Sequence, residues 1–145
     1  MAINIFENIY RLINKYNQKT KKPKTYGTED LLYAAEVHLI EIIGSYEQIT
    51  TTKLAQVLGI TKGAVSQTTT KLLQKGLIEK VNSPERTNEV FISLSDSGKR
   101  VFAYHREMHA GMQKEIQKIL QDLPPKSQQA MEQMFSIIDK SLDNL

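Results

Sequence analysis

The sequence predicts a mainly α-helical protein with a small β-wing, namely a winged helix-turn-helix with long helices on either side of it. Three observations indicate this fold class. Two short helical patterns are joined by a turn that contains Gly59, which is the arrangement of a helix-turn-helix. Two runs of strand-forming residues follow directly, and longer helical patterns occupy both ends of the chain. A chain of 145 residues is long enough to bury the core of one domain.

The N-terminal part is predicted to contain two helices. Apolar residues recur at helical spacing across residues 2–18, so this segment should form an amphipathic helix. Residues 11–24 contain six basic residues and no acidic one. Such a run is typical of a solvated loop, and an arm that contacts DNA is the alternative. Thr28 is then predicted to cap a helix that runs to about Gly44, because its side chain can accept a hydrogen bond from the first turn.

The helix-turn-helix is predicted to begin with Thr51 as the N-cap of a short helix. Gly59 follows that helix and can adopt the left-handed conformation that ends it. Thr61 is expected to cap the second helix, which would enter the major groove of DNA. The residues predicted to face inward are Leu54, Ala55 and Leu58 in the first helix and Ala64, Val65, Leu72 and Leu73 in the second.

The second helix has a polar outer face made of Lys62, Ser66, Gln67, Thr69, Thr70 and Lys71. Ser66 and Gln67 have hydrogen-bonding groups that suit base edges, and a Gln amide can form two hydrogen bonds to adenine. Lys62 and Lys71 are expected to bind phosphates. The residues of this helix and its cap that we expect to contact DNA are Thr61, Lys62, Gly63, Ser66, Gln67, Thr70 and Lys71.

A β-hairpin is predicted after the second helix. Residues 78–81 and 90–94 are rich in strand-forming side chains, and Asn82-Ser83-Pro84 has the composition of a turn. The hairpin would place Lys80 and Arg86 beside the recognition helix. An Arg at such a tip can enter a narrow minor groove.

Two long helices are predicted in the C-terminal third, the first from Asp96 to about Leu120 and the second after Pro124-Pro125. The last helix has an apolar stripe that consists of Met131, Met134, Phe135, Ile138 and Leu142. A winged helix needs only about 70 residues, so the remaining helices must have another role. They either cover the core of one chain or form the interface of a homodimer.

The charge of the chain permits an anionic partner. The formal net charge is +3, and residues 53–100 hold eight Lys and Arg against four Asp and Glu, so the positive excess follows the helix-turn-helix and wing. The absence of cysteine excludes disulfides and thiolate metal sites. No signal peptide or membrane span is expected, which predicts a cytoplasmic protein. No catalytic arrangement of nucleophile and base is recognisable, so we do not expect an enzyme.

The run from Leu54 to Gly98 resembles the MarR family of winged-helix transcriptional regulators. The resemblance rests on Lys62-Gly63-Ala64-Val65-Ser66, on residues 72–78 and on Leu94-Ser95-Asp96-Ser97-Gly98. The wing departs from the family pattern. The family places Asp-x-Arg shortly before the second strand, whereas this chain has Pro84-Glu85-Arg86-Thr87-Asn88-Glu89, with its Arg offset by about two positions.

The resemblance implies a single domain over residues 1–145 that works as a homodimer. Residues 1–27 and 96–145 would form the dimerisation helices, and residues 28–95 would form the DNA-binding lobe. Such a dimer would place two recognition helices about 34 Å apart on a palindromic double-stranded site.

Three histidines lie outside the helix-turn-helix and wing and are candidate effector ligands. His105 and His109 are four residues apart and share a helix face, which allows both imidazoles to bind one metal ion. His38 has apolar neighbours at helical spacing, so its side chain is expected to point inward. The alternative is structural, with two solvated histidines and one core histidine bonded to the backbone.

The same positions resemble two groups within the MarR family, the zinc-responsive repressors and the regulators of fatty-acid synthesis. A zinc site would use His38, His105 and His109, with Glu29, Glu36 and Glu107 as candidate carboxylate ligands. An acyl-type or other apolar effector would need a tunnel between helices, lined by Leu31, Ile42, Phe102 and Met108. Aliphatic residues at helical spacing also occur as plain core.

These patterns together predict a sequence-specific, dimeric DNA-binding transcriptional regulator that acts as a repressor. Its DNA affinity would be set by a metal or an acyl-type effector bound between the DNA-binding lobe and the dimerisation helices. A winged-helix protein-interaction module without effector sensing is the alternative.

Overall fold

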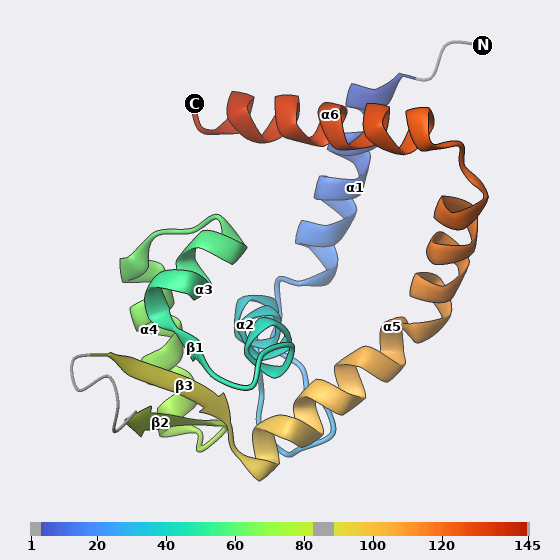
Figure 1. The fold of residues 1–145 in the computed structure, drawn as a ribbon. Helices are drawn as coiled ribbons and strands as arrows, with labels where there is room; N and C mark the ends of the chain where they lie inside the picture. Colours follow the sequence, from blue (N-terminus) through green and yellow to red (C-terminus); the bar gives the residue numbers. More distant parts are fainter. Residues whose placement is uncertain (1–3, 83–88, 145) are drawn as a thin grey trace. The chain divides into compact units, whose positions relative to one another are not determined.

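The computed structural model describes residues 4–82 and 89–144 and is mainly helical with a small antiparallel sheet, as predicted. The elements in chain order are α1 (Ile5–Lys19), α2 (Ala34–Gly44), β1 (Ile49–Thr50), α3 (Thr51–Leu58), α4 (Lys62–Gln74), β2 (Ile78–Asn82), β3 (Val90–Leu94), α5 (Asp96–Asp122) and α6 (Pro125–Leu142) (Figure 1). The chain divides into two compact units, residues 1–106 and residues 107–145. Within the described segments, no helix combines the length and hydropathy that a membrane crossing requires.

The sheet of the first unit has three strands in the order β1-β3-β2, and neighbouring strands are antiparallel. β2 and β3 form the predicted wing, with Ile78 opposite Leu94 at one end and Asn82 opposite Val90 at the other. The sequence analysis did not predict β1, because two residues are too few to reveal a strand pattern.

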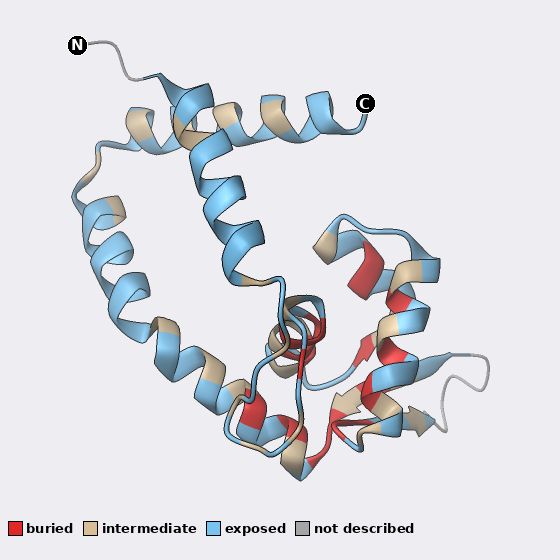
Figure 2. Cartoon of the chain, turned by 180° about the vertical axis from the view of Figure 1, so that it is seen from behind, coloured by how far each residue is buried: buried red, intermediate tan, exposed pale blue. Residues whose placement is uncertain are grey.

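The core of the first unit lies between α2, α3, α4 and the sheet, where α2 packs against α3, α4 and β3. Every buried apolar side chain of the described residues lies between Leu32 and Val101. Figure 2 shows these buried positions gathered in the central elements and at the start of α5, whereas α1 is mostly exposed. The winged helix therefore has a hydrophobic core of its own.

The second helix begins at Ala34 and not at Thr28, so its predicted start is wrong. The preceding segment is not helical, because the chain bends at residues 26–29 and pairs with itself on either side of the bend. Lys24 and Leu32 exchange two backbone hydrogen bonds of 3.0 and 2.8 Å. In this β-bridge the backbone N–H and C=O groups of Lys24 and Leu32 are hydrogen-bonded to each other. They are therefore not available to a helix that begins at Thr28.

The buried face of α2 also differs from the prediction. It consists of Glu36, Val37, Leu39, Ile40 and Ile43. His38 was expected to point inward but is exposed, because it lies on the opposite side of the helix. Glu36 can be buried because its carboxylate lies 2.6 Å from Lys75 Nζ and accepts a hydrogen bond from Tyr33 N at 2.9 Å. Lys75 also donates to the Leu31 carbonyl at 2.9 Å, so the ion pair ties the start of α2 to the end of α4.

Two glycines permit close contact between α5 and the winged helix. A Cβ added to Gly44 would overlap the ring of Phe102, and a Cβ added to Gly98 would overlap the carbonyl oxygen of Leu77. The first turns of α5 therefore pack directly on the backbone of the lobe, and a side chain at either glycine would force them apart.

The second unit contains the C-terminal part of α5 and all of α6, which begins at Pro125 as predicted. None of its described residues is buried. An apolar groove of about 380 Å³ is lined by Ile116, Leu120, Gln128, Met131, Glu132 and Phe135. In the predicted α6 stripe, Phe135 and Leu142 leave 62% and 60% of their surface exposed.

Candidate nucleic-acid interface

Two threonine caps and one glycine define the helix-turn-helix. Thr50, and not Thr51 as predicted, caps α3 by accepting a hydrogen bond of 3.2 Å from a backbone N–H of the first turn. Gly59 ends α3 with φ = +65°, in the left-handed conformation that the sequence predicted. Thr61 caps α4 in the same manner at 3.1 Å, which confirms the predicted start of this helix.

The inner face of α4 packs against the core through Val65, Thr69 and Leu72, all of which are buried. Thr69 was predicted to lie on the outer face, and this prediction is wrong. Its hydroxyl donates to the Ser66 carbonyl at 3.0 Å, so the only donor of its side chain is satisfied inside the helix. A polar side chain whose hydrogen bond is made locally can be buried at small cost.

The outer face of α4 is open to solvent. The predicted DNA-contacting residues are all exposed, namely Thr61, Lys62, Gly63, Ser66, Gln67, Thr70 and Lys71. The helix contains no acidic residue. This face therefore combines amide, hydroxyl and ammonium groups without a carboxylate that would repel phosphates, which is the chemistry of a major-groove surface.

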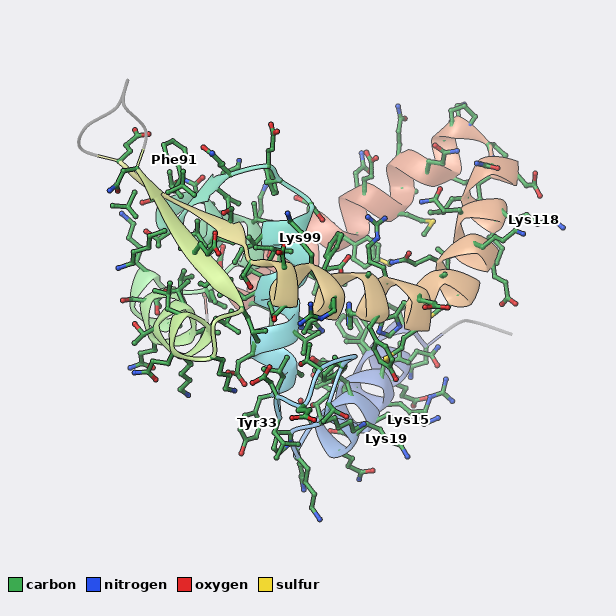
Figure 3. The ribbon with its side chains drawn as sticks, turned by 90° about the horizontal axis from the view of Figure 1, so that it is seen from below. Lys15, Lys19, Tyr33, Phe91, Lys99 and Lys118 are labelled. Atoms are coloured by element: carbon green, nitrogen blue, oxygen red, sulfur yellow. The ribbon has the colours of Figure 1, made fainter. Side chains whose placement is uncertain are left out.

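The described part of the wing contributes Lys80, which is exposed on β2 opposite Ile92 of β3. Phe91 lies on β3 near the tip of the hairpin, opposite Val81 (Figure 3). Arg86 lies outside the described residues, so its contact with the minor groove stays a prediction. The basic side chain of Lys80 is therefore exposed on β2, the first strand after the recognition helix α4.

A cluster of ionisable side chains joins α1, α2 and the start of α5 within the first unit. We call it the histidine cluster, and it consists of Tyr16, Tyr26, His38, Glu41 and His105. His105 Nδ1 lies 3.0 Å from Glu41 Oε2, and the ring centroids of His38 and His105 are 6.0 Å apart. Tyr16 stacks on His38 at 5.9 Å, and Tyr26 lies 6.1 Å from His105. Burial, and secondarily the charge of Tyr26, raises the pKa of the Tyr16 hydroxyl above its ordinary value.

The histidine cluster contains two of the three histidines predicted to bind metal. His109 belongs to the second unit. Across residues 4–82 and 89–144, no group of three His, Asp or Glu side chains is placed to hold a metal ion. Of the candidate carboxylates, Glu36 is bound to Lys75. The metal site thus stays a prediction.

The sequence analysis missed Glu41 and Tyr16 as members of this cluster. Glu41 had a local signal, because it lies three residues after His38 and so shares its helix face. Tyr16 is 22 residues from His38, and its hydroxyl lies 3.4 Å from Nδ1 of that ring. Only the packing of α1 against α2 brings this pair together, and no spacing in the sequence indicates it.

The residues predicted to line an apolar tunnel have different environments. Ile42 and Phe102 are half-buried and pack against the core. Leu31 leaves 58% of its surface exposed, and Met108, which belongs to the second unit, leaves 56%. Ile42 and Phe102 therefore have a packing role, and the tunnel stays a prediction.

Comparison with known proteins relates this chain to one family of regulators. Residues 32–85 match the model of the MarR family. The HTH-type transcriptional regulator YhjH of Bacillus subtilis (strain 168) is 30% identical over 84 residues, which cover 58% of this chain and 48% of YhjH. The matched segment thus spans about half the length of this relative.

Two solved structures share the fold over nearly the whole chain. The adhesin competence repressor AdcR from Streptococcus pyogenes has a TM-score of 0.71 at 16% identity, and the match covers 97% of this chain and 98% of AdcR. FabT from Streptococcus pneumoniae, solved in complex with DNA, has a TM-score of 0.64 at 22% identity, with 96% and 98% covered. The similarity extends beyond the winged helix to the terminal helices, which confirms the predicted fold class.

Proposed function

Because this chain belongs to the MarR family, we propose that it is a dimeric transcriptional regulator that binds a palindromic double-stranded operator through α4 and the wing. The observation that carries this proposal is the outer face of α4, which is exposed, polar and free of acidic residues. The positive excess of residues 53–100 favours a polyanionic partner. FabT, which has the same fold, was solved in complex with DNA.

The side chains of the interface have different roles in this proposal. Ser66 and Gln67 read base edges, because the polar groups of their side chains make no hydrogen bond to the described part of the chain. Lys62 and Lys71 bind phosphates on either side of the groove, and Lys80 and Arg86 extend the contact along the wing. The hydrogen bonds to bases provide specificity, whereas the cations provide affinity for any sequence.

The proposed dimer rests on apolar side chains that the terminal helices leave exposed. α1 has no buried residue, and between 40% and 68% of the surface is exposed for Ile5, Phe6, Tyr10, Leu12, Ile13 and Tyr16. On α6, between 60% and 66% is exposed for Phe135, Ile137 and Leu142. Large apolar side chains left exposed along a helix are typical of an interaction site. A second copy is the partner that matches a palindromic operator, since both have two-fold symmetry.

Repression is the proposed mode of action. A dimer with recognition helices about 34 Å apart covers two successive major grooves. DNA that is covered in this way is closed to another protein on the same face. AdcR, which shares the fold, is named as a repressor.

The histidine cluster is the proposed effector site. A ligand there would contact α1, α2 and the start of α5, and it changes DNA affinity only if it binds one arrangement of these helices better than another. The imidazoles of His38 and His105 and the carboxylate of Glu41 suit a divalent metal, most readily zinc. The tyrosine rings of the cluster suit an acyl-type or other apolar molecule, which remains the alternative effector.

Selection of binding sites from a random duplex library tests the DNA-binding proposal. We expect the full chain to enrich a palindrome whose half-sites are about one helical turn apart, and its affinity should fall steeply with salt. Gln67→Ala should lose about 1–3 kcal/mol on the selected site and little on random DNA, whereas Gln113→Ala on α5 is a control. If nothing is enriched, the protein-interaction module becomes the better account.

Equilibrium dialysis with zinc tests the effector proposal. We expect the double change His105→Ala with His109→Ala to abolish zinc uptake and spare DNA binding without effector. Uptake by the unaltered chain should fall below about pH 6, because only neutral imidazole binds metal. If the unaltered chain takes up no zinc and the double variant still responds to acyl ligands, the histidines have a structural role.

A further inference from the structure

Three consecutive threonines of α4 use their hydroxyl groups inside the helix. Thr68 donates to the Ala64 carbonyl at 3.0 Å, Thr69 to the Ser66 carbonyl at 3.0 Å, and Thr70 to the same carbonyl at 2.8 Å. Thr69 is buried and Thr68 is half-buried, so only Thr70 belongs to the exposed outer face. The shortest of the three bonds is thus made by the threonine that would face DNA.

This hydrogen bond determines what Thr70 can offer to a base. A hydroxyl has one hydrogen, and in Thr70 that hydrogen is directed at the backbone. A threonine in a helix is held in such a rotamer by its bond to the carbonyl four residues earlier. Donation to a base would require this bond to break. The methyl group needs no rearrangement to make a contact.

We infer that Thr70 is a thymine contact, and that it binds the 5-methyl group through its own methyl group and not through its hydroxyl. Thymine is the base that presents a methyl group in the major groove, and a threonine methyl is a suitable partner for it. The inference rests on the proposed function and assigns one specificity determinant within the same surface.

The position of Thr70 predicts where this thymine lies relative to the other contacts. Thr70 follows Gln67 by three residues and Ser66 by four, so the three side chains share one face of α4. Gln67 suits adenine. A half-site that contains neighbouring A·T pairs therefore satisfies Gln67 and Thr70 together, whereas a G·C pair at the position of Thr70 offers no methyl group.

Two substitutions separate the methyl group from the hydroxyl. Thr70→Val keeps a β-branched side chain and a methyl group but removes the hydroxyl, and Thr70→Ser does the reverse. Thr70 is exposed, so circular dichroism should show folded protein for each variant. On the DNA, uracil in place of a single thymine removes only the 5-methyl group. Uracil outside the half-sites is the matched DNA control.

We expect uracil at one thymine of each half-site to weaken binding by the unaltered chain about fourfold per half-site, as for the loss of one buried methyl group. Thr70→Ser should lose the same factor on the thymine site and lose nothing more on the uracil site. Thr70→Val should bind both sites as the unaltered chain does.

Two results would overturn the inference while leaving the proposed function intact. One is a selected site on which no uracil substitution changes affinity. The other is a loss for Thr70→Val as large as that for Thr70→Ser, since this would assign the contact to the hydroxyl oxygen. Failure of the unaltered chain to select any DNA would refute the proposed function and the thymine contact together.

Discussion

Leu54, Leu72 and Ile92 of the winged helix keep at most 1% of their surface exposed, whereas Phe6 and Tyr10 of α1 leave 68% and 65% exposed. The first group lies in a lobe whose helices are capped and whose buried carboxylate is paired. α1 and α6 are amphipathic helices with no buried residue. The lobe thus has a packed core of its own, whereas α1 and α6 keep their apolar side chains exposed.

The two regions differ in what the spacing of their apolar residues predicts. In the lobe, apolar residues pack against other residues of the lobe, so their spacing predicts both the elements and the core. Apolar residues of α1 and α6 have the same spacing but remain exposed, and in the proposed dimer a second chain would cover them. We therefore expect substitutions in the lobe to change the stability of the fold, and substitutions in the terminal helices to change association.

The largest effect should come from the core of the lobe. Leu72→Ala removes a fully buried side chain of α4 and should lower the free energy of unfolding by about 2–5 kcal/mol. Urea denaturation followed by circular dichroism measures this change. Ile60→Ala, at a position that is 43% exposed, is the control and should change stability by less than about 0.5 kcal/mol. Equal effects of the two would contradict the assignment of the core.

A smaller effect is expected at the proposed dimer interface. Phe6→Ala or Phe135→Ala should weaken dimerisation by about 2 kcal/mol, which is roughly a 30-fold rise in Kd. Sedimentation over a range of protein concentrations measures this constant. Val57→Ala on α3, which is 40% exposed, should leave it unchanged. An unchanged dimer in both phenylalanine variants would remove the terminal helices from the interface.

The ion pair between α2 and α4 should contribute less than the core. Lys75→Met removes the cation that pairs with Glu36, and Glu36 is only 3% exposed. We expect a loss of about 1–3 kcal/mol, at the lower end because Lys75 is itself partly solvated. The double change with Glu36→Gln should recover most of this loss, since the amide oxygen can still accept from Tyr33 N. If the double variant is as unstable as Lys75→Met, the loss of stability would come from the packing of the Lys75 side chain and not from its charge.

The smallest effect is expected from the wing. Arg86→Ala should leave folding unchanged and lower the slope of log affinity against log salt by about one unit, the value for one lost phosphate contact. Binding measured by fluorescence anisotropy at several salt concentrations gives the slope. Lys114→Ala on α5 should not alter it. An unchanged slope for Arg86→Ala would identify this residue as part of the turn only.

Much of the fold was predictable because its signals are local. The caps Thr61 and Gly59, the two wing strands and the start of α6 at Pro125 each depend on a few neighbouring residues. Two helix starts were misplaced. α2 begins at Ala34 because Lys24 and Leu32 pair in a β-bridge, and the helical cap signal at Thr28 gave no indication of this pairing.

The candidate sites were also predictable to different degrees, because one depends on the spacing within a single helix and the other on contacts among several helices. The exposed face of α4 follows from helical periodicity, apart from Thr69, whose hydroxyl is satisfied within the helix. The histidine cluster depends on contacts among three helices, so Glu41 and Tyr16 had to be found in the structure.

Sedimentation equilibrium of the full chain with a selected duplex tests most directly whether the lobe binds DNA while the terminal helices join two chains. With two half-sites on the duplex, we expect two chains per DNA. A duplex with one half-site should bind far more weakly. Phe6→Ala should reduce the advantage of the second half-site without changing the affinity for a single half-site. One chain per palindromic duplex at full affinity would contradict the account, because the terminal helices would then have no part in DNA recognition.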